Sequence, residues 1–296
     1  MHKRIFSICT CLFLFCFLLT ACGDAQQAGS FLSFFDQKDS GQTGLFGVSL
    51  AIGKADAHFL RLDGACILID TGEEEDGSAI VSFLKEQGAQ KLDWLILTHL
   101  DKDHIGGADA VLDAFATEHV VLPNYEKDSQ QYEQLVEALG RQWLDPVRLE
   151  GDMSLTVGEA QVQLWASGMS QYTADEDDNA FSIVTKITYG NTRFLFAGDA
   201  EERRLQELLD MGDIQCDFLK VPHHGRAEKS SQDFLKAVSP KYAVITDSKD
   251  ARADKEVRSY LEQLGTVTYE TMHGDVYFQS DGQNLTVEQK KSQNAD

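Results

Sequence analysis

The sequence is poor in cysteine outside its N-terminal segment. It has six cysteines in 296 residues, and four of them lie within the first 22 residues. The other two, Cys66 and Cys216, lie in apolar runs typical of buried strands, which favours free buried thiols. A disulfide between these two stays an alternative, but a disulfide framework is excluded as the basis of the fold.

Positive charge is also scarce. The chain has 26 lysine and arginine residues against 48 aspartate and glutamate residues, which gives a formal net charge of −22. Nonspecific affinity for nucleic acids comes mainly from lysine and arginine side chains on phosphates. The balance therefore argues against tight general DNA binding, while it leaves small phosphodiester substrates open.

A long apolar run occurs only at the N-terminus. His2-Lys3-Arg4 precedes an apolar stretch over residues 5–19, and Leu19-Thr20-Ala21-Cys22 ends it. At about 15 residues the stretch is short for a membrane span of about 20, although a transmembrane anchor is the alternative. We expect a lipoprotein signal peptide over residues 1–21, lipidation at Cys22 and a flexible tether over residues 22–42. The protein would then be extracytoplasmic and anchored to the cell membrane.

The remaining sequence has no internal repeat or long linker, so we predict one domain over residues 43–285 and a polar tail over 286–296. Apolar periodicity predicts strands at 46–52, 58–62, 65–69, 92–97, 119–122, 162–166, 181–189, 192–197, 217–221, 242–246, 267–269 and 276–279. It predicts helices at 78–87, 105–115, 129–141, 201–211, 232–238 and 255–264. This order fits an α/β fold of two sheets covered by helices.

Four potential metal ligands lie within six residues, directly after the apolar run Trp94–Leu97. They are His99, Asp101, Asp103 and His104. A strand that ends near Thr98 brings them to one edge of a sheet, and Gly106-Gly107 lets the next helix begin close to them. Two carboxylates so close together need a cation between them. Imidazole with carboxylate suits zinc, manganese or iron, so the spacing predicts a divalent metal site.

Two later strands also end in candidate ligands. Gly198-Asp199 follows an apolar strand, and His223-His224 follows another. Gly-Asp alone is a common turn, and a histidine pair is often a surface feature. Beside the first cluster, however, we expect Asp199 and at least one of the two histidines to be ligands.

These motifs together resemble the metallo-β-lactamase superfamily. The segment His99-x-Asp101-x-Asp103-His104 is similar to its metal motif, with aspartate where many members have the middle histidine, and Leu68–Gly72 is similar to its first motif. The finer resemblance is to the extracellular domain of the DNA-uptake competence protein ComEC and its stand-alone relatives. Asn179–Ser182 and Lys220–Gly225 fit further elements of that pattern, and Gly53–Asp56 fits one of them in part.

The resemblance implies a four-layer αβ/βα sandwich with two divalent ions, zinc or manganese, at an edge shared by the two sheets. Its implied metal ligands are His99 and Asp101 for the first ion, Asp103 and His104 for the second, Asp199 as the bridge, and His223 or His224 to complete the second.

One expected ligand is missing from this pattern. Many superfamily members have a histidine before the Gly-Asp strand, and the nearest polar residues in this chain are Asp178 and Asn179. Asn179, together with Asp56 and Asp70, is expected beside the ligands rather than among them.

Asp101, Asp103 and His224 are the candidate catalytic residues. Either aspartate would orient an attacking water, and whichever histidine of the pair is not a ligand would assist the leaving group. Lys220 is a candidate for contact with an anionic substrate, although a strand lysine is more often a solvated side chain. His273, in a late loop, is a further candidate.

Three functions fit this sequence. The first is a surface-anchored, metal-dependent hydrolase of phosphodiester bonds, which includes nucleic-acid processing. The second is a metallo-hydrolase of another substrate class, such as a phosphocholine ester, a lactone or a β-lactam, because the superfamily does not fix the substrate. The third is a non-catalytic metal-binding accessory lipoprotein. The nearly complete ligand set argues against the third, and the sequence leaves the oligomeric state open.

Overall fold

The computed structural model describes residues 43–168 and 178–290. The expected signal peptide, Cys22 and the tether lie outside these ranges, as do the last residues of the expected tail. Within the described ranges, no helix is both long and apolar enough to cross a membrane.

The first sheet contains eight of the described strands, in the order β15-β14-β1-β2-β3-β4-β5-β6. Their bounds are β1 Leu45–Ser49, β2 His58–Leu62, β3 Ala65–Ile69, β4 Leu92–Ile96, β5 Thr117–Pro123, β6 Val147–Leu149, β14 Val276–Ser280 and β15 Leu285–Gln289. The strands β3 to β6 are parallel, and the others pair antiparallel. Ile96 of β4 is in register with Ile69 on one side and Val121 on the other, so three carboxyl ends lie at one edge.

The second sheet contains seven strands of the described chain, in the order β13-β12-β11-β10-β9-β8-β7. Their bounds are β7 Met153–Val157, β8 Ala160–Trp165, β9 Val184–Tyr189, β10 Thr192–Phe196, β11 Phe218–Lys220, β12 Tyr242–Ile245 and β13 Val267–Glu270. The strands β10 to β13 are parallel. Lys220 is in register with Phe196 and Val244, so the ends of β10, β11 and β12 also lie at one edge.

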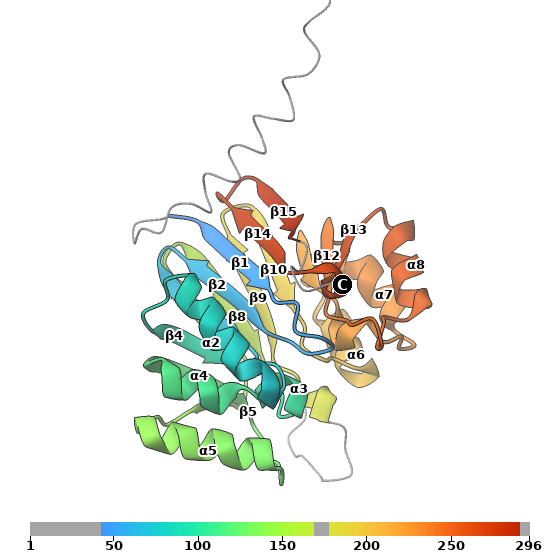
Figure 1. The fold of residues 1–296 in the computed structure, drawn as a ribbon. Helices are drawn as coiled ribbons and strands as arrows, with labels where there is room; N and C mark the ends of the chain where they lie inside the picture. The colour runs from blue at the N-terminus through green and yellow to red at the C-terminus, as the bar shows by residue number, and fades with distance from the viewer. Residues whose placement is uncertain (1–42, 169–177, 291–296) are drawn as a thin grey trace, which may run out of the picture. The chain divides into compact units, whose positions relative to one another are not determined.

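Helices cover the outer face of each sheet, as Figure 1 shows. Those over the first sheet are α2 Gly77–Glu86, α4 Ala108–Ala114 and α5 Gln130–Gln142, and those over the second are α6 Glu202–Met211, α7 Ser231–Val238 and α8 Lys255–Gln263. Short helical turns complete the described chain: α3 Lys102–Ile105, η1 Glu74–Asp76, η2 Asp178–Phe181, η3 Pro222–Gly225 and η4 Thr271–His273. The sequence of layers confirms the expected four-layer αβ/βα sandwich.

An aromatic cluster joins the two sheets face to face. Phe194, Phe196 and Phe218 of the second sheet pack against Phe278 of the first, and the ring centroids of Phe218 and Phe278 are 4.3 Å apart. All four are essentially inaccessible to solvent. Each buried side chain of this size contributes about 1.5–3 kcal/mol through burial. The cluster therefore fixes the spacing of the sheets whose ends form the site.

Most predicted elements agree with the structure, and the differences have local causes. The predicted helix over 105–115 is shorter in the structure, where α4 spans Ala108–Ala114 and the separate turn α3 ends at Ile105. Gly106 and Gly107, between the two, pack against backbone atoms of residues 71–77. The strands β6, β7 and β15 were not predicted. Since β15 runs to Gln289, the folded part extends past the expected boundary at residue 285.

Candidate metal centre

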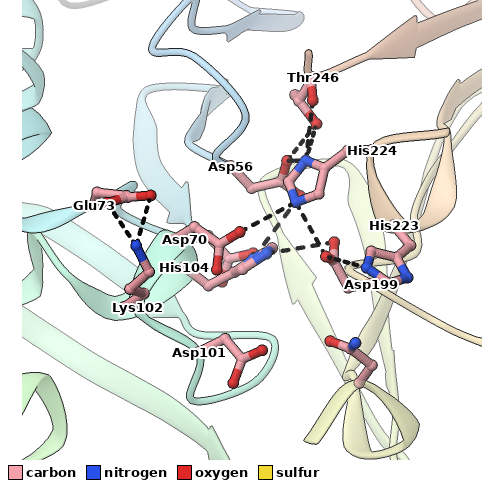
Figure 2. A network of polar contacts seen from close by, with 12 residues as sticks. Asp56, Asp70, Glu73, Asp101, Lys102, His104, Asp199, His223, His224 and Thr246 are labelled. Carbon is pink, nitrogen blue, oxygen red and sulfur yellow. Dashed lines mark hydrogen bonds and ion pairs between the residues drawn. The ribbon is translucent and has the colours of Figure 1, made fainter. Parts of the chain in front are cut away.

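Four side chains converge where the parallel strand ends of the two sheets meet. They are Asp103 and His104 in α3, Asp199 directly after β10, and His224 in η3. One ligand atom of each lies within 4.8 Å of the corresponding atoms of the other three. Figure 2 shows His104, Asp199 and His224 pointing toward one another. Open sheets of this kind bind ligands beyond the carboxyl ends of their parallel strands.

The distances among these atoms fit a metal ion. His224 Nε2 is 3.1 Å from Asp199 Oδ2 and 3.5 Å from Asp103 Oδ2, and His104 Nε2 is 3.4 Å from Asp199 Oδ1. Two ligand atoms each about 2.1 Å from a tetrahedral ion are about 3.4 Å apart. Both Nε2 atoms are buried and form no hydrogen bond within the described chain. A buried polar atom without a hydrogen bond indicates a missing partner, and one metal ion would bind both Nε2 atoms at once.

Hydrogen bonds behind the two histidines orient their rings. His104 Nδ1 lies 2.8 Å from Asp70 Oδ2, and His224 Nδ1 lies 3.0 Å from the carbonyl oxygen of Thr246. Each Nδ1–H therefore donates outward, which leaves the Nε2 lone pair directed at the cluster. Asp70 also accepts hydrogen bonds from the backbone amide and the hydroxyl of Thr98, at 2.7 and 2.8 Å.

A buried ion pair lies behind the cluster. Lys220 Nζ is 2.5 Å from Asp56 Oδ2 and 3.2 Å from Asp199 Oδ1, and it donates to the carbonyl oxygen of Gly198. Asp56 also accepts a hydrogen bond from the Thr246 hydroxyl at 2.6 Å. Lys220 is fully buried, so it stabilises Asp56 and Asp199 and does not reach a substrate.

The charges of the site are set by these contacts. Burial opposes ionisation of Asp199, but its contacts with His224, His104 and Lys220 outweigh burial and hold the pKa of Asp199 well below its usual range. Burial and the neighbouring His104 lower the pKa of His99 to about 3, so His99 is neutral. A buried carboxylate beside neutral imidazole is a favourable environment for a divalent cation.

Sequence comparison identifies the family. The family model of the metallo-beta-lactamase superfamily matches residues 52–246. The chain belongs to the metallo-beta-lactamase superfamily. Members of this superfamily are generally metal-dependent hydrolases, which agrees with the four-ligand cluster.

The curated relatives of this superfamily member include competence proteins. It is 28% identical to ComE operon protein 3 of Bacillus subtilis over 187 residues, which cover 62% of this chain and 24% of that protein. It is 30% identical to competence protein ComA of Neisseria gonorrhoeae over 214 residues, which cover 70% of this chain and 26% of that protein. The chain thus spans about a quarter of the length of these relatives. The matches confirm the ComEC-like resemblance expected from the motifs.

Solved structures show the same fold. The metallo-beta-lactamase fold protein YhfI from Bacillus subtilis aligns with a TM-score of 0.54 at 13% identity, covering 82% of this chain and all of that one. CmlA, a diiron beta-hydroxylase from Streptomyces venezuelae, aligns with a TM-score of 0.51 at 14% identity, covering 86% of this chain and 57% of that one.

The residues expected to hold a first ion lie beside the four-ligand cluster. The His99 ring packs on the His104 ring at 4.0 Å between centroids, and its Nε2 lies 3.8 Å from Asp101 Oδ2. Asp101 forms an ion pair with Lys127, and Lys127 Nζ also lies 2.5 Å from Asp178 Oδ2. Burial opposes the charged form of Lys127, but these two carboxylates raise its pKa. An ammonium group therefore lies between two carboxylates on the first-ion side.

His223, the other histidine of the pair, has a different environment from His224. His223 Nδ1 is 2.9 Å from Glu201 Oε1, which also accepts a hydrogen bond from Asn179 at 3.0 Å. His223 Nε2 lies 3.8 Å from Asp199 Oδ2. His223 thus stands next to the ligand cluster with its other nitrogen held by a carboxylate. Glu228 lies near the same pair.

Left-handed backbone conformations separate the two histidines. His223 and His224 have φ values of 46° and 51°, and Asp70 has a φ of 59°. Such values are strained for residues other than glycine and gather at functional sites. Here they direct consecutive imidazoles to different partners, which places His224 in the ligand cluster and His223 on Glu201.

The open side of the site carries three charged groups. The side chains of Asp103, Asp101 and Lys127 are 22%, 32% and 27% exposed, whereas that of His224 is 1% exposed. The cluster is therefore open to solvent on the side of Lys127 and the two aspartates.

Lys127 and Glu201 were not predicted as site residues. Lys127 follows β5, the parallel strand next to β4, so its loop opens on the same edge as the metal motif. Glu201 follows Asp199 by two residues, and this proximity is the signal that could have found it.

The remaining candidates lie in other environments. His273 is mostly exposed, and its Nε2 lies 3.9 Å from Glu270 Oε2. Cys66 and Cys216 are both free and buried, which confirms the expected free thiols. Burial raises the pKa of both thiols.

Proposed function

We propose that this chain is a metal-dependent hydrolase of phosphodiester bonds, anchored to the extracytoplasmic side of the cell membrane through lipidated Cys22. The observation that carries the proposal is the buried cluster of Asp103, His104, Asp199 and His224, with two imidazole Nε2 atoms lacking a hydrogen bond. The mixed imidazole and carboxylate set suits zinc or manganese. A divalent ion in this cluster would supply Lewis acidity and lower the pKa of a bound water from about 15.7 to about 7.

The protein groups supply orientation and proton transfer. Asp70 and Thr246 hold the imidazoles of His104 and His224 with their Nε2 atoms toward the cluster. His223 Nδ1 lies 2.9 Å from Glu201 Oε1. As a water oxygen bonds to phosphorus and the ester phosphorus–oxygen bond breaks, His223 would donate a proton from Nε2 to the leaving-group oxygen, and the proton released by the water would pass to solvent. General acid catalysis of this kind contributes about 10²–10⁴-fold to the rate.

Three observations support a phosphodiester as the substrate class. Two relatives are named for recombination and for competence, recombination protein 2 of Haemophilus influenzae and competence protein ComA of Neisseria gonorrhoeae. Lys127 presents a positive charge on the open side of the site, where an anionic ester would enter. A recess of about 310 Å³ is lined by residues that include Asn124, three residues before Lys127, and Phe181, three residues after Asp178, together with Glu150. Its volume is at the lower end of the range for small-molecule sites, about 300–1,000 Å³.

Hydrolysis of bis(p-nitrophenyl) phosphate by the full-length chain in detergent tests this function. We expect turnover with manganese or zinc, and loss of it after treatment with a chelator. Asp103→Ala should abolish turnover because it removes a ligand from the cluster. Asp145→Ala, which changes an exposed loop residue, is the matched control and should leave the rate unchanged.

Two results would contradict the proposal: no turnover of any phosphodiester by the metal-loaded chain, or unchanged turnover by the Asp103→Ala variant. Phosphocholine and a chromogenic β-lactam belong in the same assay. Turnover of only one of these would assign the chain to another substrate class.

A further inference from the structure

We propose that the Lys127 ammonium group takes the place of a first metal ion, so that the chain binds one divalent ion in the four-ligand cluster. The inference deepens the proposed function, on which its statement about substrate rests. Lys127 contacts Asp101 and Asp178, two of the residues from which a first-ion site would be built. Its single positive charge would then lie beside the metal ion and face the entering phosphate.

The geometry places the ammonium group among the expected ligands. Asp101 comes from the metal motif, and Asp178 is one of the two polar residues nearest the position where many superfamily members have the histidine that this chain lacks. Lys127 Nζ contacts both carboxylates, at 2.5 Å in the case of Asp178 Oδ2. A divalent ion bound to Asp101 would lie close to this ammonium and would be repelled by it. The neighbouring Asn179 is already engaged with Glu201.

The loop that carries Lys127 is fixed at several points. The Tyr125 hydroxyl accepts a hydrogen bond from the backbone amide of Leu100 at 2.7 Å, which ties the loop to the metal motif. The Tyr125 ring packs on Phe181 at 5.0 Å, which ties it to the turn that contains Asp178. Arg148 donates to the carbonyl oxygen of Tyr125 at 2.7 Å. Lys127 is therefore held where the two carboxylates meet.

The orientation of the four ligands does not depend on Lys127 or on the open side of the site. The histidines of the cluster are oriented by Asp70 and Thr246, and Asp199 is held by Lys220. These contacts come from behind the cluster, whereas Lys127 lies on the open side. One complete set of four ligands thus stands next to a position where the single charge of Lys127 pairs with two carboxylates.

Metal stoichiometry of the full-length chain tests the inference. We expect elemental analysis after manganese or zinc loading and desalting to find one ion per chain in the wild type. Lys127→Met removes the charge and keeps the length of the side chain, so this variant should bind a second ion. Lys102→Met is the matched control, since Lys102 is exposed and pairs with Glu73 at 3.1 Å, and it should bind one ion.

A second variant gives an independent answer. Asp101→Asn in the wild-type background should keep one ion with unchanged affinity, because Asp101 holds Lys127 and not the metal. Two ions in the wild type, one ion in folded Lys127→Met, or loss of an ion in Asp101→Asn would each overturn the inference. Circular dichroism spectra establish that each variant is folded.

Activity separates this inference from the proposed function. With one equivalent of metal, Lys127→Met should hydrolyse bis(p-nitrophenyl) phosphate about a hundredfold more slowly in kcat/KM, because one charged group facing the phosphate is lost. A second equivalent should restore part of the rate. If no form of the chain hydrolyses phosphodiesters while the metal counts are as expected, the function is wrong and the assignment of Lys127 stands. Unchanged kcat/KM in Lys127→Met at one equivalent would show that the ammonium does not meet the substrate.

Discussion

Two consecutive histidines contact different groups because of their backbone conformation. With φ values near 50°, His223 and His224 project their rings in different directions, one to Glu201 and one to the ligand cluster. The strain of such conformations costs about 1–3 kcal/mol at each residue. The preceding strand and the hydrogen bond from the His223 amide to the Gly198 carbonyl hold the turn in place.

Replacement of His223 tests its role as a proton donor. Asparagine tolerates a left-handed backbone, so His223→Asn keeps the turn and removes the imidazole. We expect kcat on a dinucleotide substrate to fall by about 10²–10⁴-fold, because its alkoxide leaving group needs a proton. The loss on bis(p-nitrophenyl) phosphate should be much smaller, since p-nitrophenolate leaves without one.

The controls for this prediction separate catalysis from structure. The metal content of His223→Asn should equal that of the wild type. His119→Asn, which changes an exposed histidine stacked on Trp94, should leave both rates unchanged. Equal losses on the two substrates, or loss of metal, would show that His223 is not the proton donor.

The residue types predict where the site lies but not which way each side chain points. The spacing from His99 to His104 and the strand-end positions of Asp199 and the histidine pair located the site. Which histidine faces the ligands depends on φ values that the residue types do not reveal. The two lysines show the same limit. Lys220, the candidate for contact with a substrate, is buried in β11, whereas Lys127, which was not predicted, lies in a polar loop on the open side of the site.

At the scale of elements, the glycine pair after the metal motif determines how α3 and α4 pack. A Cβ atom at position 107 would lie 2.4 Å from the Thr71 carbonyl oxygen and 2.9 Å from the Gly77 Cα atom. The Thr71 amide donates to the carbonyl oxygen of His104 at 2.7 Å. Crowding at Gly107 therefore acts directly on the segment that carries a metal ligand.

Alanine at position 107 tests this coupling. Gly107 has a φ of −88°, so the effect of Gly107→Ala is steric and not conformational. We expect a loss of about 1–3 kcal/mol in the free energy of unfolding, measured by urea denaturation, together with weaker metal binding. Gly140→Ala is the control: position 140 lies in α5 with open space around it, and alanine there should stabilise the helix by about 0.5–1 kcal/mol. Unaltered stability and metal affinity in Gly107→Ala would contradict the packing argument.

The elements that were not predicted share one position in the fold. The strands β15, β6 and β7 are edge strands of their sheets, and most of their residues are partly or fully exposed. An edge strand buries fewer side chains, so its apolar pattern is weak. The central strands β2 and β3 are buried almost throughout, and their predicted bounds agree with the structure.

At the scale of the whole molecule, Asp63 joins the two sheets at the end opposite the metal site. It accepts hydrogen bonds from the Gly44 amide at 2.7 Å, the Glu159 amide at 2.7 Å and the Tyr189 hydroxyl at 3.1 Å. Burial would raise the pKa of Asp63, but these three donors outweigh it and lower the pKa. The charged form is therefore favoured in the folded protein.

The lowered pKa predicts how this contribution varies with pH. The stability from Asp63 is fully present above the pKa of an unfolded aspartate, about 3.9, and is lost as the pH falls through the lower folded value. Asparagine tolerates the left-handed φ of 48° at position 63. We therefore expect Asp63→Asn to lower the free energy of unfolding by about 2–4 kcal/mol at pH 7, through the loss of the charged hydrogen-bond acceptor. The difference between wild type and variant, measured by urea denaturation, should shrink at pH 3. A difference that grows on acidification would contradict the assignment.

The net charge of −22 predicts which phosphodiesters the chain prefers. A long polyanion meets the repulsion of the whole surface, whereas a dinucleotide meets only the field at the site entrance, where Lys127 lies. We expect kcat/KM for a dinucleotide to exceed that for long single-stranded DNA at low salt. Raising the salt should improve hydrolysis of the DNA, because at about 0.1 M the Debye length is about 10 Å and distant charges are screened. Fluorescence anisotropy should find no tight DNA binding in the same buffers. Faster hydrolysis of DNA than of the dinucleotide at low salt, declining as salt is added, would show that the acidic surface does not select against polymers.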